Sequence, residues 1–224
     1  VMRTPDNGAT TSENTRYTRT ELREMLRAGN SSISTHGVNG NNWVLSTAPQ
    51  SSQSAAGGVD GVLSVTMAVN SVVETAGENF QHGRLVIGQI HGEDDEPIRL
   101  YYRKLPSNTR GSIYAAHEEF GGDDTYFEII GSRDNDAADP QDGIMLDQKF
   151  TYTIDARGDA LNVTITSNGT EIGHTLIDMS ASGYDTDWMY FKAGVYQLGS
   201  YANNTSDVSE FSQVSIYELS TSHD

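Results

Sequence analysis

The sequence contains no cysteine among its 224 residues, which excludes a disulfide framework and a thiolate metal site. It also lacks long apolar runs, and no stretch approaches the roughly 20 apolar residues that a membrane-spanning helix needs. We expect no signal peptide in this chain, because no apolar segment follows a basic start. A chain of this length buries roughly 70% of its unfolded surface, so a core can form without covalent crosslinks.

Basic side chains are scarce. The chain has 14 Lys and Arg residues against 31 Asp and Glu residues, and its formal net charge is −17. Such a field repels nucleic acids and anionic membrane surfaces, so we expect neither as a partner. The charge is typical of a protein that stays soluble in an extracellular setting, and we expect a secreted or periplasmic monomer.

Short apolar alternations, 22 glycines and many Ser, Thr and Asn residues predict an all-β protein. The predicted strands recur roughly every 10 to 25 residues between Gly, Pro, Asn and Asp clusters, which is typical of a two-sheet sandwich or jelly roll. No linker divides the chain, so residues 1–224 are expected to form one domain. The expected strands are 43–49, 61–70, 84–91, 98–105, 125–132, 149–156, 161–168, 188–198 and 208–219.

The remaining segments are less regular. The Asn-Gly pair in 167–172 predicts a hairpin turn, and the polar tracts 51–61 and 132–143 predict loops. Segment 18–29 fits a short helix by propensity, but it also fits a strand whose polar side chains share one face. The residues alone leave these two alternatives open.

Three short segments place polar side chains on one face of an expected strand. They are RTELR (19–23), QIH (89–91) and YFKAGVY (190–196). Gln89 and His91 are two residues apart and therefore share a face, as do Lys192 and Tyr196. Each pattern taken alone is also typical of an ordinary solvated strand.

Together, and in this order, the three segments resemble the motifs of the alginate lyases of polysaccharide lyase family seven. The resemblance implies a β-jelly roll with a concave substrate cleft. It also implies a catalytic group of Arg19, Gln89, His91 and Tyr196, with Glu21, Arg23 and Lys192 supporting or lining the cleft. The chain departs from the family after the last tyrosine, where Gln197-Leu198 stands in place of Asn-Gln, and we expect an effect on subsite preference.

The implied reaction is β-elimination on a uronate polymer, in which a base removes the C5 proton and the C4–O bond breaks. The substrate carboxylate must first be neutralised, which arginine, Gln89 and His91 can do by donating hydrogen bonds. Tyr196 can act as both base and acid, or His91 can be the base and Tyr196 the acid. The sequence leaves both schemes open, and neither requires a metal or an organic cofactor.

A polyanionic substrate requires basic groups in the cleft of this acidic protein. In segment 98–105, Arg99, Tyr101 and Arg103 share one face, and we expect them to form further substrate subsites. An ordinary exposed strand face explains the same pattern equally well.

The lead hypothesis is an endolytic alginate lyase that acts on guluronate-containing or mixed blocks, because members with isoleucine at the position of Ile90 are associated with that preference. Mannuronate preference or broad specificity is the first alternative. A non-catalytic jelly roll that binds acidic polysaccharide is the second. A glycoside hydrolase would need a strand-borne pair of carboxylates, whereas the acidic segment 92–97 is expected to be a turn.

Overall fold

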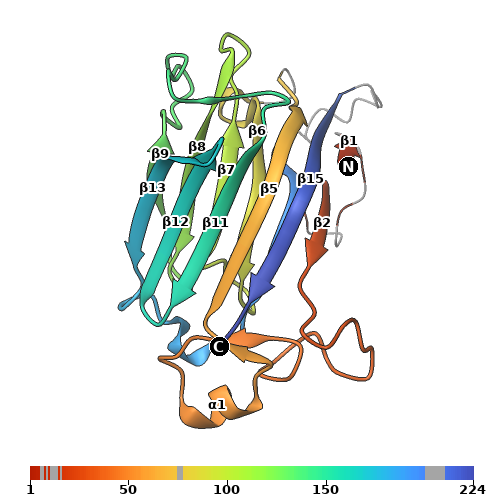
Figure 1. Ribbon diagram of the computed structural model, residues 1–224, viewed down its shortest axis with the longest axis vertical. Helices are drawn as coiled ribbons and strands as arrows, with labels where there is room; N and C mark the ends of the chain where they lie inside the picture. Colours follow the sequence, from red (N-terminus) through yellow and green to blue (C-terminus); the bar gives the residue numbers. More distant parts are fainter. Residues whose placement is uncertain (6–7, 9, 11–14, 16, 75–77, 200–209) are drawn as a thin grey trace.

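The computed structural model describes residues 1–5, 8, 10, 15, 17–74, 78–199 and 210–224. Two antiparallel sheets stack face to face in a β-jelly roll, which confirms the predicted fold class (Figure 1). The first sheet has six strands in the order β1-β15-β5-β11-β12-β13. Their bounds are Met2–Pro5, Phe211–Ser222, Gly61–Ser71, Phe150–Arg157, Ala160–Ser167 and Thr170–Asp178.

The second sheet has seven strands. Its order is β10-β8-β7-β6-β14-β2, and β9 also pairs with β8. The bounds in that order are Ile144–Met145, Arg110–Glu118, Ile98–Arg103, Arg84–His91, Tyr190–Gln197 and Arg19–Arg23, with β9 at Asp124–Ile130. The smaller elements are β3 (Trp43–Val44), β4 (Gly58–Val59), α1 (Gln50–Ala55), η1 (Asn79–Gln81) and η2 (Tyr184–Thr186). None of the described helices is long and apolar enough to cross a membrane.

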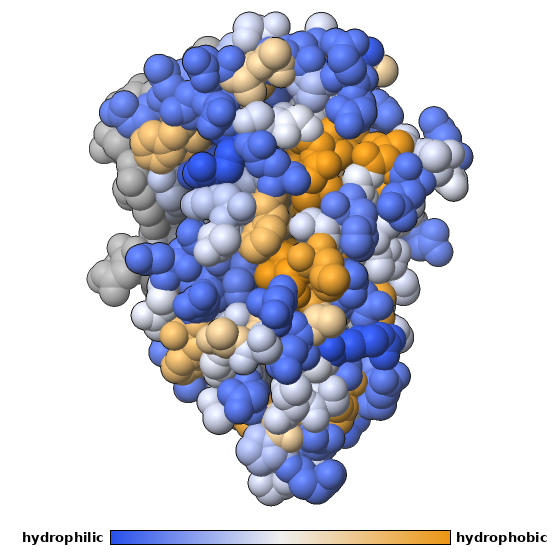
Figure 2. Space-filling view, turned by 90° about the vertical axis from the view of Figure 1, so that its left-hand side faces the viewer, coloured by the Kyte–Doolittle hydropathy of each residue, from blue (hydrophilic) through white to orange (hydrophobic). Residues whose placement is uncertain are grey.

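The core lies between the two sheets. In β12, Leu161, Val163 and Ile165 are fully buried, while the residues between them are half-buried, as the period of two predicts. Figure 2 shows the edge where β9 and β13 lie, with apolar patches between hydrophilic surfaces. There Ile129 and Ile172 pack against the core cluster. Apolar burial on this scale, at about 25 cal/mol per Å² of apolar surface, holds the two sheets together.

A bulge in β6 decides which of its side chains point away from the core. The pairing of β6 with β7 shifts register between Val86 and Gly88. Ile87 is buried in the core, and a Cβ on Gly88 would lie 2.6 Å from the hydroxyl of the core residue Tyr152. Both residues therefore face the core, and Gln89 and His91 stay on the other side. We call that side of the seven-stranded sheet its outer face.

Most of the predicted strands form near their expected bounds; the structure decides one open alternative and corrects two local expectations. Residues 19–23 form strand β2, because pairing with the edge of β14 outweighs the helix propensity of the segment. Residues 50–55 form α1 directly after Pro49, so part of tract 51–61 is helical. Only the first two residues of segment 43–49 form a strand. Residues 208 and 209 lie outside the described residues.

The predicted hairpin is present between β12 and β13. Asn168 and Gly169 have φ values of 51° and 77°, as a two-residue turn with two left-handed positions requires. Gly194 in β14 has a different constraint. Its φ is 155°, and a Cβ there would lie 2.4 Å from the carbonyl oxygen of Thr20 in β2. Glycine at this position is what lets β2 approach β14.

Replacing these two glycines compares a position that has both a steric clash and a positive φ with one that has a positive φ alone. Gly194→Ala should lower the free energy of unfolding by about 3 kcal/mol or more, because the new methyl group overlaps the backbone of β2. Gly169→Ala should cost about 1 kcal/mol, since a Cβ there meets nothing within 4 Å and only the left-handed φ is penalised. Urea unfolding of both variants measures the difference. Equal losses would contradict the clash.

A half-buried histidine ties the C-terminus to Glu24, the residue that follows the strand with the RTELR motif. The Nε2 atom of His223 lies 2.9 Å from a carboxylate oxygen of Glu24, and its Nδ1 atom lies 2.6 Å from the carbonyl oxygen of Asp60. The other Glu24 oxygen accepts a hydrogen bond from the backbone N–H of Phe191 in β14. Burial lowers the pKa of His223, but its bonds to Glu24 and Asp60 outweigh burial and raise the pKa above 6.5.

This contact should stabilise the protein most in mildly acidic solution. Because the pKa of His223 is raised on folding, its contribution is complete below pH 6.5 and is lost as the pH rises through the folded-state pKa. His223→Gln should therefore lower the free energy of unfolding by about 2 kcal/mol at pH 5.5 and by less at pH 9. Denaturant unfolding at the two pH values tests this sign. A larger loss at pH 9 would contradict it.

Candidate functional site

The three motif segments lie side by side in the seven-stranded sheet. Strand β14 is paired on one side with β2 and on the other with β6. Within this register, Lys192 lies between Arg23 and Gln89, Tyr196 lies opposite Arg19, and Tyr190 lies opposite His91. Residues far apart in the sequence thus meet on one outer face.

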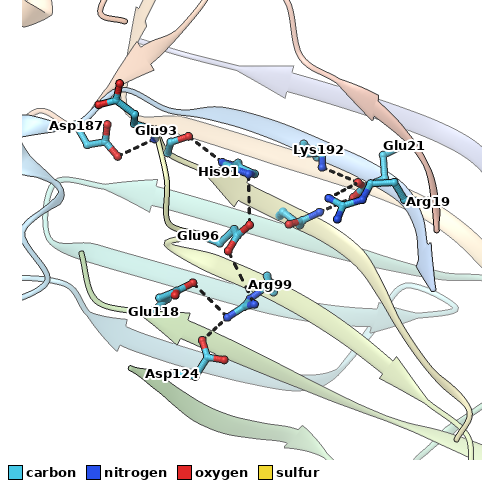
Figure 3. Close-up of polar contacts among 12 residues, drawn as sticks. Arg19, Glu21, His91, Glu93, Glu96, Arg99, Glu118, Asp124, Asp187 and Lys192 are labelled. Atoms are coloured by element: carbon cyan, nitrogen blue, oxygen red, sulfur yellow. Dashed lines mark hydrogen bonds and ion pairs between the residues drawn. The ribbon is translucent and has the colours of Figure 1, made fainter. Parts of the chain in front are cut away.

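Glu21 is the centre of the first polar group on this face (Figure 3). Its carboxylate lies 2.5 Å from Nζ of Lys192 and 3.8 Å from Nη1 of Arg19, and it accepts a hydrogen bond from the side-chain amide of Gln89. The Glu21 side chain is only 5% exposed. One buried carboxylate therefore orients two cations and an amide, and it leaves the group with net positive charge.

Arg19 lies over the ring of Tyr196. The distance from its Cζ atom to the ring centroid is 3.6 Å, which is a cation–π contact. Burial raises the pKa of Tyr196, and the charge of Arg19 only partly opposes this effect. The phenol is consequently protonated at neutral pH and can donate a proton.

His91 is held in one tautomer. Its Nδ1 atom lies 2.8 Å from the carbonyl oxygen of Gly92, which can only accept, so Nδ1 carries the hydrogen. The ring stacks on Tyr190 at a centroid distance of 5.2 Å. Burial lowers the pKa of His91, with the positive charges of Lys192 and Arg19 adding to the effect. The lowered pKa favours the neutral imidazole with its lone pair on Nε2, whereas the Glu96 carboxylate 3.3 Å from Nε2 favours a proton there.

Arg23 is directed away from the Glu21 group. Its guanidinium donates to the carbonyl oxygen of Thr35 at 2.7 Å and to the side-chain oxygen of Asn42 at 3.0 Å. Its Cζ atom lies 3.8 Å from the centroid of the Tyr190 ring. Arg23 thus joins the loop after β2 to the aromatic ring that supports His91.

A second polar group runs from His91 to Arg99, and Figure 3 shows it beside the first. The Nε2 atom of His91 lies 3.3 Å from a carboxylate oxygen of Glu96. Arg99 pairs with Glu96 at 3.9 Å, with Glu118 at 3.3 Å and with Asp124. Burial raises the pKa of Glu118 to about 7, Arg99 opposes this, and Glu96 adds to it.

This second group changes the interpretation of Arg99. Its guanidinium is already paired with Glu96, Glu118 and Asp124, so it does not present the uncompensated cation expected for a substrate subsite. Sequence reasoning missed Glu96, Glu118 and Asp124, because they come from a turn and two strands that no motif connects. The only signal was Arg99 itself, since an arginine within a mostly buried strand needs partners.

The other two predicted subsite residues also share the outer face, but both are buried. Tyr101 is 4% exposed and stacks on Tyr114 at a centroid distance of 4.7 Å. Arg103 is 4% exposed and donates to the carbonyl oxygens of Asn79, His82 and Arg133. Tyr101 is therefore held by ring stacking and Arg103 by three backbone carbonyl groups. No described group of three His, Cys, Asp or Glu side chains is arranged to hold a metal ion.

Comparisons with known proteins match this fold and these motifs. The model of a family described as alginate lyase matches residues 1–223. A curated alginate lyase from Klebsiella pneumoniae is 49% identical over 234 residues, which cover 100% of this chain and 75% of the relative.

Solved structures agree. The crystal structure of the alginate lyase from Klebsiella pneumoniae has a TM-score of 0.93 at 46% identity and covers 99% of this chain and 80% of that chain. An exolytic alginate lyase from Zobellia galactanivorans shares the fold, with a TM-score of 0.72 at 19% identity over 99% of this chain and 83% of that chain.

The fold and its relatives define this protein as a polysaccharide lyase. The chain belongs to the alginate lyase family, polysaccharide lyase family seven, and the family resemblance carried by the three motifs is confirmed.

Removing the charge of Glu21 should destabilise the outer face. Glu21→Gln leaves Lys192 and Arg19 without their buried counterion, so the free energy of unfolding should fall by about 3 kcal/mol. The matched control is Glu171→Gln, which removes the charge of an exposed glutamate on β13 and should change stability by less than about 0.5 kcal/mol. Chemical denaturation measures both. A Glu21→Gln variant as stable as the control would contradict the central position of this carboxylate.

Proposed function

We propose that this protein is an endolytic alginate lyase that cleaves the 1,4-glycosidic bond by β-elimination and leaves 4,5-unsaturated uronate ends. One observation carries the proposal: Arg19, Gln89, His91 and Tyr196 lie on the outer face of three adjacent strands. These residue types supply what the reaction requires, namely donors for the substrate carboxylate, a base and an acid.

The first requirement is to offset the charge of the uronate carboxylate next to C5. Gln89 and Arg19 are both held by Glu21, so they are positioned before substrate binds. Such preorganised donors stabilise the enolate-like transition state more than the ground state, because negative charge develops on the carboxylate as the C5 proton leaves. Lys192 adds positive charge beside them.

The protonation states favour His91 as the base and Tyr196 as the acid. The neutral imidazole has a lone pair on Nε2 and can accept the C5 proton, while the protonated phenol can donate a proton to the departing O4. Both groups interact with the charges of Arg19 and Glu21, which supports their action at one sugar residue. Tyr196 acting alone as base and acid is the alternative scheme.

Substrate preference depends on residues below the surface. Ile90, which favours guluronate-containing or mixed blocks, is fully buried in the core, so any influence on the sugar must pass through Gln89 and His91. Gln197 is also buried and accepts a hydrogen bond from the backbone of Ser212, while Leu198 packs with Tyr101 and Tyr114. The two residues that depart from the family motif are thus buried. They can change a subsite only by moving the residues that pack against them.

Product analysis separates the finer proposals. Endolytic cleavage predicts oligomers of mixed length early in the reaction, whereas an exolytic enzyme releases short products throughout. Digestion of guluronate-enriched and mannuronate-enriched alginate measures block preference. We further propose that the protein acts as a monomer outside the cytoplasm, where a polymeric substrate is accessible.

The decisive variant is Tyr196→Phe. Incubation of the wild-type protein with alginate should raise the ultraviolet absorbance as unsaturated ends form, and Tyr196→Phe should lower kcat by about 100-fold or more, because the general acid is lost. Tyr217→Phe is the matched control, since Tyr217 is 53% exposed on β15 of the other sheet, and it should retain full activity.

Two results would contradict these proposals. Binding of alginate by the wild-type protein without any rise in absorbance would support a non-catalytic polysaccharide-binding jelly roll. Full activity of Tyr196→Phe would leave the lyase in place but exclude this tyrosine as the acid.

A further inference from the structure

The outer face is electrostatically asymmetric along its strands. At the end near His91, the guanidinium of Arg99 is outnumbered by the carboxylates of Glu96, Glu118 and Asp124. At the opposite end, where β6 begins and β7 ends, three arginines meet around a pocket of about 120 Å³. They are Arg84, Arg103 and Arg133, and Phe80, Tyr114, Asp134 and Asn135 also line the pocket. We call this the three-arginine pocket.

Two of the arginines have no carboxylate partner among the described residues, and the Arg84 side chain is hydrogen-bonded to Tyr114. Among the described residues, neither Arg84 nor Arg133 has a carboxylate within the 4.0 Å of an ion pair. The Nε atom of Arg84 is buried and has no hydrogen-bond partner in the described part of the chain. Arg133 lies over the ring of Tyr126, with its Cζ atom 3.8 Å from the centroid. Stacking of this kind fixes the guanidinium plane while leaving its N–H donors unused.

The third arginine holds the pocket in shape. Arg103 donates to the carbonyl oxygen of Arg133 at 2.5 Å and to the side-chain oxygen of Asn135 at 2.9 Å, so it fixes the loop that carries Arg133. Asp134 also lines the pocket, and Glu128 accepts a hydrogen bond from the backbone N–H of Arg133. Three guanidinium groups against these two carboxylates leave the pocket positive in an otherwise acidic protein.

The pocket suits a carboxylate group. Its volume is too small for a polymer segment, and planar guanidinium donors match the two oxygens of a carboxylate. Arg84 precedes Gln89 by five residues in β6, and one of these is absorbed by the bulge. Four strand steps place the pocket about 13 Å from the Gln89 position along the outer face. Tyr196 pairs with Val86, two residues from Arg84, so a polyuronate held between Gln89 and Tyr196 reaches the pocket with a sugar beyond the one being cleaved.

We propose that the three-arginine pocket binds the carboxylate of a uronate residue remote from the scissile bond. This proposal rests on the proposed function. It adds that most of the binding energy from sugars other than the one being cleaved comes from one side of the cleavage point. The acidic group around Arg99 gives no comparable attraction at the other end. Substrates long enough to reach the pocket should accordingly be cleaved more efficiently than short ones.

The test compares Arg133→Gln and Arg84→Gln with the matched control Arg157→Gln, which removes an arginine from β11 in the other sheet. The value of kcat/KM is measured on a trimeric and an octameric oligouronate. We expect the kcat/KM of each pocket variant to fall about 10-fold on the octamer, equivalent to about 1.4 kcal/mol, and less than 2-fold on the trimer. The control should match the wild-type protein on both.

A binding measurement, combined with a check that each variant is folded, separates the pocket proposal from the lyase proposal. Octamer affinity is measured by calorimetry in the Tyr196→Phe background, with thermal unfolding confirming an intact fold. Arg133→Gln should weaken this affinity about 10-fold, whether or not the wild-type protein cleaves alginate. Two outcomes, with a wild-type protein that cleaves alginate, would refute the pocket and leave the lyase function in place. In the first, the pocket variants keep full affinity for the octamer. In the second, their kcat/KM falls equally on the trimer and the octamer. If the wild-type protein forms no unsaturated product while Arg133→Gln still weakens octamer binding, the lyase function fails and the pocket stands.

Discussion

The buried carboxylate of Glu21 is the interaction on which the outer face depends. It is 5% exposed and contacts Lys192, Arg19 and Gln89, which come from three neighbouring strands. An isolated carboxylate at such a site would be costly, and its contacts with two cations and an amide offset that cost. The same contacts place donors on the outer face before any ligand arrives. Stability and preorganisation are therefore two consequences of one charge arrangement.

The backbone makes this arrangement possible. Gly194 lets β2 approach β14, and the bulge at Ile87 keeps Val86, Gln89 and His91 on one side of β6 despite their uneven spacing. His223 also pairs with Glu24, directly after the end of β2. These constraints lie outside the ligand-facing surface, but each of them determines where a functional side chain points.

The sequence predicted the motif strands and their faces because a period of two assigns each side chain to one side of a sheet. Lys192 and Tyr196 are on the outer face, and Phe191 and Val195 are in the core, as that alternation requires. It could not decide between helix and strand for 19–23, because that outcome depends on pairing with β14, a contact remote in sequence. Nor could it show that Arg99 is neutralised, since Glu118 and Asp124 reach it only through sheet register. The roles of individual site residues remain predictions.

The most direct test of the account is to map where an oligouronate contacts the protein. NMR chemical-shift perturbation in the Tyr196→Phe variant, titrated with an octameric oligouronate, reports this residue by residue. The account predicts perturbations centred on Arg19, Gln89 and His91 that extend along the outer face toward Arg84. Perturbations confined to the six-stranded sheet, or no perturbation at Gln89 and His91, would contradict it.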